Sequence, residues 1–173
     1  FGVAWGPGAR RVRASESYWR QPLAWDRKAA KAGKPLRVFC ASLADVFDEE
    51  VASAWRLELL QLITATPHLI WMLLTKRPNV ALRLAQHDGR WPLPNVWLGV
   101  TVENQAMADL RVPLLLQIPA AKRFISAEPL LGPIDLPVDF LALGNDAWCI
   151  TGGESGPHAR PSHPDWFRSL RDQ

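Results

Sequence analysis

The sequence predicts an α/β protein built around a parallel sheet, and two observations support this fold class. The first is a series of five short apolar runs, which begin near residues 37, 69, 96, 123 and 148. Their starts are roughly 25 to 32 residues apart, which is the length of a βα unit. The second is that each run is apolar throughout, as expected of parallel strands buried on both faces. Five successive βα units form either a doubly wound sheet or part of a (β/α) barrel.

Residues 1–36 are predicted to form a basic loop and a helix that lead into the first strand. The helix is expected over residues 19–33, because Gly33 ends it and the lysines near its C-terminus suit the helix dipole. Nine of the 20 Lys and Arg residues lie within the first 37 positions, and the formal net charge of the chain is +3. The rest of the chain is therefore close to neutral or slightly acidic. This charge is compatible with a polyanionic partner but does not require one.

The five expected strands alternate with helices along the chain. The strands are residues 37–42, 69–74, 96–102, 123–127 and 148–151. The helices that follow them are 51–65, 79–86, 105–116 and 164–170. Pro113 is expected to kink or split the third of these helices, because proline lacks the N–H that the helix needs. Ser162 or His163 is expected to cap the last helix, and the Pro-rich segment 131–145 is predicted to have no regular element.

The composition points to a cytoplasmic protein. The longest apolar stretch, residues 69–74, is far shorter than the ~20 residues that cross a bilayer, so no membrane partner is predicted, and there is no secretory signal. Cys40 and Cys149 fall inside expected strands and are interpreted as core residues, with no disulfide framework. The sequence begins at Phe1 without Met and ends within an expected helix, so we interpret it as a fragment.

Polar residues follow every expected strand, and they define a predicted ligand site. In both candidate folds, ligands bind at the carboxyl ends of the strands. The residues at these ends are Ser42, Asp45, Thr75, Lys76, Arg77, Glu103, Asn104, Ser126, Glu128, Gly152, Gly153, Glu154 and Ser155. Three glutamates near one rim need cations, a metal or a ligand, because an unpaired buried carboxylate is costly. Lys76 and Arg77 are the cations nearest in sequence, and the set favours an anionic or zwitterionic ligand with hydroxyl groups.

Two common types of site are not predicted. The four histidines lack the H-x-H or H-E-x-x-H spacing of metal sites, so no histidine-ligated metal is expected. The Gly152–Gly156 segment has neither the G-x-S-x-G pattern of a nucleophile elbow nor the Gly-Lys-Ser/Thr of a P-loop.

Several long segments of the chain resemble one family, a phage-associated, radical-SAM-like family of uncharacterised proteins with an N-terminal three-cysteine motif. The segments are WRQPLAW (19–25), VFCASLADVF (38–47), LLTKRP (73–78), PNVWLGVTVE (94–103), FISAEPLLGP (124–133), TGGESG (151–156) and ARPSHP (159–164). The resemblance covers nearly the whole chain in register. It implies a single partial (β/α) barrel domain of the radical-SAM/TIM type over residues 1–173, in which five βα units are present.

The resemblance also implies a [4Fe–4S] cluster and S-adenosylmethionine as cofactors of the full-length protein. Three thiolates hold three of the irons and leave the fourth for the cofactor. This chain has only two cysteines, more than a hundred residues apart. The cluster is therefore not expected in this chain, and we expect the cysteine loop and the first barrel strand to lie before Phe1.

By resemblance, roles are assigned to the residues of the rim. Glu103 is expected to bind the ribose hydroxyls of the cofactor, and its neighbour Asn104 is also expected to bind the cofactor. The other expected cofactor-binding residues are Ser42 and Asp45 at the methionine amino group, and Gly152, Gly153 and Glu154 at the methionine or adenosine part. The residues expected to face the substrate, as catalytic candidates, are Lys76, Arg77 and Glu128.

Two other functions stay open from the residues. One is a nucleic-acid-binding module that uses the basic N-terminal third, including Arg10, Arg11 and Arg13. The other is a carboxylate- or metal-dependent hydrolase or lyase that uses Glu103, Glu128 and Glu154. The sequence predicts neither the substrate nor the oligomeric state.

Overall fold

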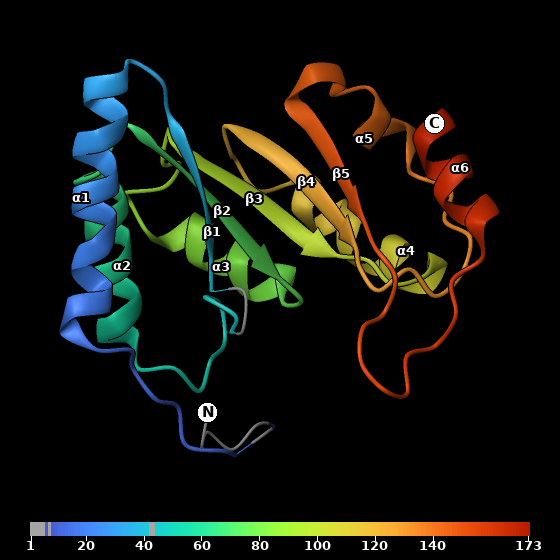
Figure 1. The fold of residues 1–173 in the computed structure, drawn as a ribbon, viewed down its shortest axis with the longest axis horizontal. Coiled ribbons are helices and arrows are strands. Elements are labelled where there is room, and N and C mark those ends of the chain that lie inside the picture. The colour runs from blue at the N-terminus through green and yellow to red at the C-terminus, as the bar shows by residue number, and fades with distance from the viewer. Residues whose placement is uncertain (1–5, 7, 42–43) are drawn as a thin grey trace.

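The computed structural model describes residues 6, 8–41 and 44–173 and contains one five-stranded sheet (Figure 1). The strands are β1 (Leu36–Cys40), β2 (Leu69–Thr75), β3 (Val96–Thr101), β4 (Lys122–Ala127) and β5 (Ala147–Thr151). Their order in the sheet is the order in the chain, and every neighbouring pair is parallel. A doubly wound sheet reverses its strand order at one point, whereas a barrel adds each strand next to the last. The fold is therefore a partial β/α barrel.

The sheet curls so strongly that side chains of its two edge strands meet. The guanidinium carbon of Arg37 on β1 lies 5.5 Å from the ring centroid of Trp148 on β5, although three strands lie between them. In a flat sheet, backbones four strand spacings apart are separated by about 19 Å. We call the face on which these side chains lie the concave face. From the strand register, Arg37, Trp97, Lys122 and Trp148 share it.

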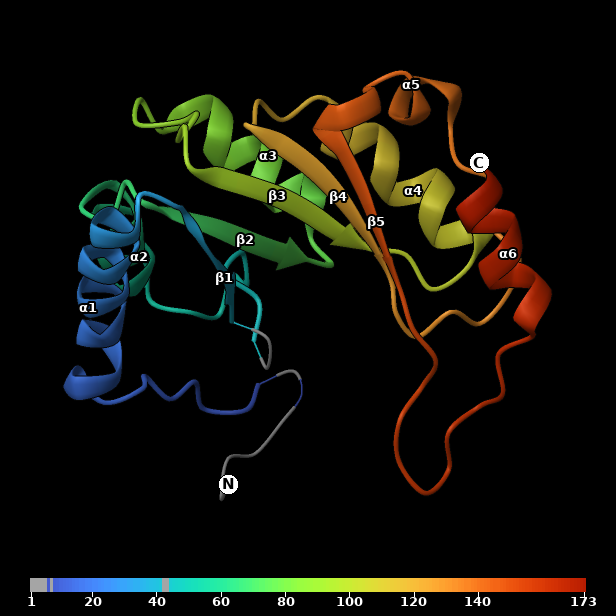
Figure 2. The same cartoon turned by 45° about the horizontal axis from the view of Figure 1, so that its top comes forward.

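The helices cover the opposite, convex face of the sheet (Figures 1 and 2). They are α1 (Glu16–Ala32), α2 (Ser53–Thr64), α3 (Pro78–His87), α4 (Gln105–Leu116), α5 (Val138–Leu141) and α6 (Pro164–Asp172). The core lies between sheet and helices, where Leu73 of β2, Leu98 of β3 and Val112 of α4 are fully buried. No helix in the described part of the chain is long and apolar enough to cross a membrane.

Capping residues determine where α1 and α6 begin and where α1 ends. The α1 helix ends at Gly33 as predicted, with a left-handed φ of 62°. It begins at Glu16, three residues before the predicted start, because the Ser15 side chain accepts a hydrogen bond from Tyr18 N. Of the two candidate caps of α6, His163 is the one observed, since its ring nitrogen Nδ1 accepts from Asp165 N at 3.2 Å.

Three predictions about the elements need correction. Pro113 does not split α4, which runs unbroken over the predicted residues. The segment 131–145 is not without regular structure, since it contains α5 and the start of a short 3₁₀ helix, Gly144–Asp146. The first strand ends at Cys40, two residues before its predicted end; the expected contribution of Ser42 lies outside the described residues.

Cys40 and Cys149 are free thiols on β1 and β5, and both are half-buried and packed against the core. Burial raises the pKa of the Cys40 thiol to about 12 and that of the Cys149 thiol to about 11. Both therefore stay protonated at neutral pH, in agreement with their interpretation as packing residues.

Candidate functional site

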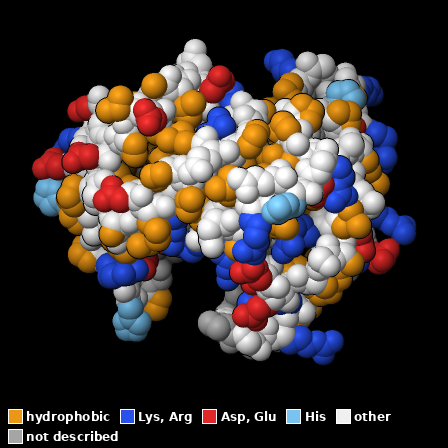
Figure 3. Space-filling view, turned by 180° about the vertical axis from the view of Figure 1, so that it is seen from behind, with side chains coloured by type: hydrophobic (Ala, Val, Ile, Leu, Met, Phe, Trp, Pro, Cys, Tyr) orange, Lys and Arg blue, Asp and Glu red, His pale blue; other side chains and the backbone are white. Residues whose placement is uncertain are grey.

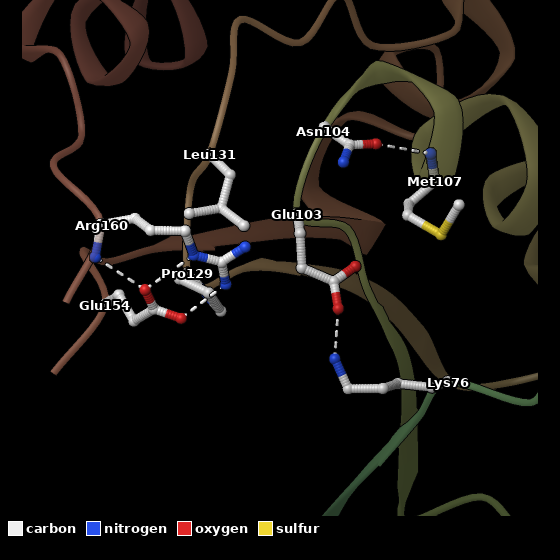
Figure 4. Close-up of a pocket in the computed structure, with 8 residues that line it drawn as sticks. All are labelled: Lys76, Glu103, Asn104, Met107, Pro129, Leu131, Glu154 and Arg160. Atoms are coloured by element: carbon white, nitrogen blue, oxygen red, sulfur yellow. Dashed lines mark hydrogen bonds and ion pairs between the residues drawn. The ribbon is translucent and has the colours of Figure 1, made fainter. Parts of the chain in front are cut away.

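An open cavity of about 380 Å³ lies at the carboxyl ends of the strands (Figure 4). Its walls come from the segments that follow β2, β3, β4 and β5, which the chain brings together although they are far apart in sequence. The lining residues are Lys76, Glu103, Asn104, Met107, Pro129, Leu131, Glu154 and Arg160. Four of them, Lys76, Glu103, Asn104 and Glu154, are among the residues predicted from the strand ends.

Glu103 is held between two cations on one side of this rim pocket. Its Oε1 pairs with the Lys76 ammonium group, and its Oε2 accepts a 2.8 Å hydrogen bond from Arg111 Nη1. The same Arg111 nitrogen donates to the Thr101 carbonyl at 2.6 Å, so the guanidinium is fixed to the end of β3. The side chains of Glu103 and Arg111 are 16% and 13% exposed. This carboxylate is therefore oriented before any ligand arrives.

The protonation state of Glu103 follows from the same contacts. Burial by itself raises the pKa of a carboxyl group, but the hydrogen bond and charge of Lys76 and the charge of Arg111 lower the pKa of Glu103 on balance. Glu103 is therefore ionised at neutral pH. Each carboxylate oxygen has two acceptor sites, so both oxygens can still accept one hydrogen bond from a ligand.

Glu154 and Arg160 form the opposite side of the rim pocket. Arg160 donates to Glu154 from its backbone N at 2.7 Å and from the side-chain atoms Nε and Nη2 at 2.8 and 2.5 Å. These three hydrogen bonds join the two ends of the loop 154–160 (Figure 4). These hydrogen bonds, the side-chain ones first, lower the pKa of Glu154 to about 2.

We expect the Glu154–Arg160 contact to stabilise the protein in a defined pH range. A depressed pKa contributes stability above the ordinary value of 4.5, and this stability is lost as the pH falls through the folded-state pKa of about 2. The melting temperature of the Glu154→Gln variant should therefore lie below that of the wild type by a constant amount above about pH 5. The difference should shrink as the pH falls toward 2, when measured by circular dichroism. A difference that does not change over this range would contradict the assignment.

The floor of the rim pocket is less polar. Met107, Pro129 and Leu131 supply apolar surface next to the charged groups. Asn104 lines the cavity as the N-cap of α4, where its Oδ1 accepts from Met107 N at 3.1 Å. Its amide group therefore has a structural role, and its NH₂ donors stay available to the cavity.

Two predicted site residues, Asp45 and Arg77, do not line the pocket, because each satisfies the other. Asp45 accepts hydrogen bonds from Thr75 Oγ1 at 2.8 and 2.9 Å, from Lys76 N at 3.0 Å and from Arg77 Nη1 at 3.0 Å. Arg77 also lies 3.6 Å from Asp48. This network fixes the loop after β1 to the end of β2, and so positions Lys76 from outside the cavity.

Glu128, Gly152 and Gly153 directly follow β4 and β5 and are not among the residues that line the cavity. The Glu128 carboxyl group packs directly over Gly152, where an added Cβ would stand 2.8 Å from Glu128 Cδ. The Gly152 carbonyl accepts from Leu130 N at 2.9 Å, which joins the ends of the two strands. Gly153 lies beside the Ser162 hydroxyl, since a Cβ there would stand 3.7 Å from Ser162 Oγ. Ser42 lies outside the described residues.

The prediction that site residues directly follow the strands missed two cations of this region, Arg111 and Arg160. Arg111 lies on α4, eight residues after Glu103, where two turns of helix bring it back over the strand end. Arg160 lies in the loop before α6. A search for basic residues about two turns after a strand-end carboxylate would have found the first. No spacing rule identifies the second.

The rim carboxylates are not arranged as metal ligands. Among the side chains that the structure describes, no group of three or more His, Cys, Asp and Glu could hold a metal ion. Glu103 and Glu154 instead direct their oxygens at basic side chains.

The fold and the rim pocket define the protein as a partial β/α barrel with a charged pocket at the carboxyl ends of its strands. The chain belongs to the family described as "Protein of unknown function (DUF5131)", whose model matches residues 2–173. Comparison with curated proteins found no match. Comparison with solved structures found none either.

Proposed function

We propose that this chain is the ligand-binding core of a radical-SAM-like enzyme of the phage and prophage type, and that the rim pocket binds S-adenosylmethionine. The single observation that carries the proposal is the fixed, ionised Glu103 carboxylate at the end of β3, facing a second ion pair across the cavity. A carboxylate fixed in this way is suited to accept hydrogen bonds from a ribose diol, which presents two adjacent hydroxyl donors.

The donor set fits the other parts of S-adenosylmethionine. This ligand carries an ammonium group, a carboxylate, a ribose and an adenine ring. The pocket offers the remaining acceptor site of Glu154 Oε1 for an ammonium group and the unused N–H donors of Lys76 and Arg160 for a carboxylate. The apolar surface of Met107, Pro129 and Leu131 is available for a ring. Paired charges of both signs suit a zwitterion, since each ligand charge then meets an oriented partner.

The residues of this chain do not fit an iron–sulfur cluster. A [4Fe–4S] cluster needs three cysteine thiolates close together. Cys40 and Cys149 lie on strands at opposite edges of the sheet, and burial keeps both protonated. The role proposed for this chain is therefore to bind and orient the cofactor and substrate, and no redox step is assigned to its side chains.

The pairing of the rim carboxylates favours this proposal over a metal-dependent hydrolase. A divalent cation binds carboxylates whose oxygens are directed at it. Glu103 is bound to Lys76 and Arg111, and Glu154 to Arg160. A metal would have to displace these cations first.

The proposal is tested by titrating S-adenosylmethionine into the wild type and the Glu103→Gln variant by isothermal calorimetry. We expect the variant to bind about tenfold more weakly, because a hydrogen bond to a charged group contributes about 1.5–3 kcal/mol. Glu16→Gln, on an exposed side chain at the start of α1, changes the same charge and should leave the affinity unchanged. No measurable binding by the wild type, or equal affinity in Glu103→Gln, would reject the proposal.

A further inference from the structure

A second cavity lies at the other end of the sheet, where the strands begin. Its volume is about 180 Å³, and it is lined by Arg37, Trp97, Lys122, Asn145, Ala147 and Trp148. Four of these residues are the first or second residue of β1, β3, β4 or β5 and lie on the concave face. We call this cavity the lower pocket. The rim pocket is at the opposite ends of the same strands, so the two are separate sites.

The lower pocket combines two indole rings with two cations. Trp97 and Trp148 meet edge to face, with centroids 5.9 Å apart and an interplanar angle of 88°. The Arg37 guanidinium carbon lies 5.2 Å from the Trp97 centroid and 5.5 Å from the Trp148 centroid. The Lys122 ammonium nitrogen lies 5.6 Å from the Trp97 centroid. These distances are those of cation–π contacts, so the rings hold the cations in place.

Of the two cations, Arg37 is the one whose side-chain N–H donors have no acceptor among the described residues. Lys122 donates to the Asn145 carbonyl and lies 3.5 Å from an Asp146 carboxylate oxygen. The Arg37 side chain makes no hydrogen bond or ion pair with any residue that the structure describes, and its guanidinium group lies over the two indole rings. The guanidinium therefore presents its N–H groups to solvent in an orientation set by the indoles. This geometry suits an oxyanion such as phosphate.

Trp148 adds a stacking surface beside that anion site. It is 40% exposed and lies on the concave face of the edge strand β5. The ring meets Trp97 edge to face, and its exposed surface lines the cavity. An exposed indole beside an oriented guanidinium matches a ligand that joins a planar ring to an anion.

We propose that the lower pocket binds one nucleotide of a single-stranded nucleic acid, with a base stacked on Trp148 and a phosphate on Arg37. The wider charge distribution favours a strand over a free anion. Lys31 lies in the last turn of α1, and Lys34 is three residues from Arg37, within about 11 Å along the chain. Lys and Arg side chains gather on the α1 side of the molecule, at the right of Figure 3. Several cations on the side of the molecule that carries the stacking site suit repeated phosphates more than a single phosphorylated side chain.

This assignment moves the nucleic-acid contact away from the arginines that the sequence suggested. Arg11 is bound to Asp48 at 2.8 Å and to Glu50 at 3.2 Å, and Arg13 to Glu58 at 2.5 Å. Their charges are therefore neutralised within the protein. The lower pocket does not depend on what the rim pocket binds, so the two proposals fail or succeed separately.

The test measures binding of a short fluorescein-labelled single strand of mixed sequence by fluorescence anisotropy, with the complete chain. We expect Trp148→Ala to weaken binding about tenfold, because stacking of one base contributes about 1–3 kcal/mol. Arg37→Gln should weaken binding by a similar factor and reduce the slope of log affinity against log salt by about 0.7, the value for one lost phosphate contact on a single strand. Arg37→Lys keeps the charge and should recover part of the affinity but not all of it.

Matched controls separate the lower pocket from general charge and aromatic effects. Arg10→Gln removes the same charge from an exposed position in the N-terminal segment, and Tyr18→Ala removes an aromatic ring that is 60% exposed at the far end of α1. Both should bind as the wild type does. Melting curves confirm that each variant is folded, and Trp148→Leu replaces Trp148→Ala if the latter is not.

Three outcomes would overturn the proposal. The first is an unchanged affinity in both Arg37→Gln and Trp148→Leu. The second is an equal loss in Arg10→Gln. The third is competition by a mononucleotide, by inorganic phosphate or by a phosphotyrosine peptide that is as strong as competition by the unlabelled strand, since the site would then not be one for nucleic-acid strands.

Discussion

Replacement of Gly99 by alanine is expected to destabilise the protein by about 3 kcal/mol, the upper part of the range for overpacked cores. Gly99 lies in the middle of β3 on the concave face, beside Phe124 of β4. A Cβ at Gly99 would stand 2.4 Å from Phe124 Cε2 and 2.5 Å from Cζ. The Phe124 ring is fully buried, so it cannot swing into solvent. At about 2–4 °C per kcal/mol for a chain of this size, the melting temperature should fall by about 6–12 °C.

Two variants check that the effect comes from this contact. Gly89→Ala adds the same methyl group where nothing lies within 4 Å, and should change stability by less than about 0.5 kcal/mol. Phe124→Leu combined with Gly99→Ala should lose less than the sum of the two single losses, because the smaller side chain leaves room for the methyl group. If Gly99→Ala melts at the same temperature as Gly89→Ala, the close contact between Gly99 of β3 and the Phe124 ring of β4 is contradicted.

The central strands could be predicted from sequence because they are buried on both faces. Met72 and Leu73 of β2 point to opposite faces of the sheet and are 4% and 0% exposed, and the run that contains them stands out as a continuous apolar segment. The edge strand β1 departs from this pattern, since Leu36 and Phe39 are 38% and 42% exposed. The sequence also left the choice between a doubly wound sheet and a barrel open. Strand order decides it, and strand order depends on packing between segments far apart in the chain.

The candidate site could be predicted only in part, because strand position determines some of its residues and side-chain packing determines the others. The ends of parallel strands must meet at one edge, so Lys76, Glu103 and Glu154 could be placed together without a structure. Asp45 and Arg77 carry the same kinds of charge at the same edge of the sheet, yet they form an ion pair with each other and do not line the cavity. Sequence shows which charges lie near a rim. It does not show whether a given charge is directed at a neighbour or at the cavity, because that depends on rotamers and on loop paths.

The edges of the sheet connect the two proposed sites. The curl that brings Arg37 of β1 toward Trp148 of β5 forms the lower pocket, and the same curl turns the strand ends toward the rim pocket. The close contact of Gly99 with Phe124 lies between them on the concave face. A variant that disturbs this middle layer is therefore expected to affect both pockets, whereas variants of Glu103 or Arg37 should each affect one.

Replacement of Arg111 by methionine is expected to cost about 2–3 kcal/mol of unfolding free energy at pH 7. Breaking a buried ion pair by removing one partner typically costs about 3–5 kcal/mol. The cost is smaller here, because Glu103 and Arg111 are still 16% and 13% exposed and Lys76 remains as a second partner of Glu103. The buried Thr101 carbonyl also loses its donor. Because the pKa of Glu103 is lowered in the folded state, its ion pairs stabilise the protein above the ordinary value of 4.5, and this stability is lost as the pH falls through the lowered pKa. Urea unfolding should therefore show a loss in Arg111→Met that is largest near neutral pH and smaller in acid.

The matched control for this prediction is Arg83→Met, which breaks a surface pair with Glu49 whose side chains are 55% and 62% exposed. Such pairs contribute about 0–1 kcal/mol, so Arg83→Met should stay close to the wild type. In the double variant Glu103→Gln/Arg111→Met no buried carboxylate is left with a missing partner, so its loss should be smaller than the sum of the single losses. Equal stability of Arg111→Met and Arg83→Met would mean that Glu103 does not need Arg111. The rim pocket would then lack the fixed carboxylate on which its proposed ligand depends.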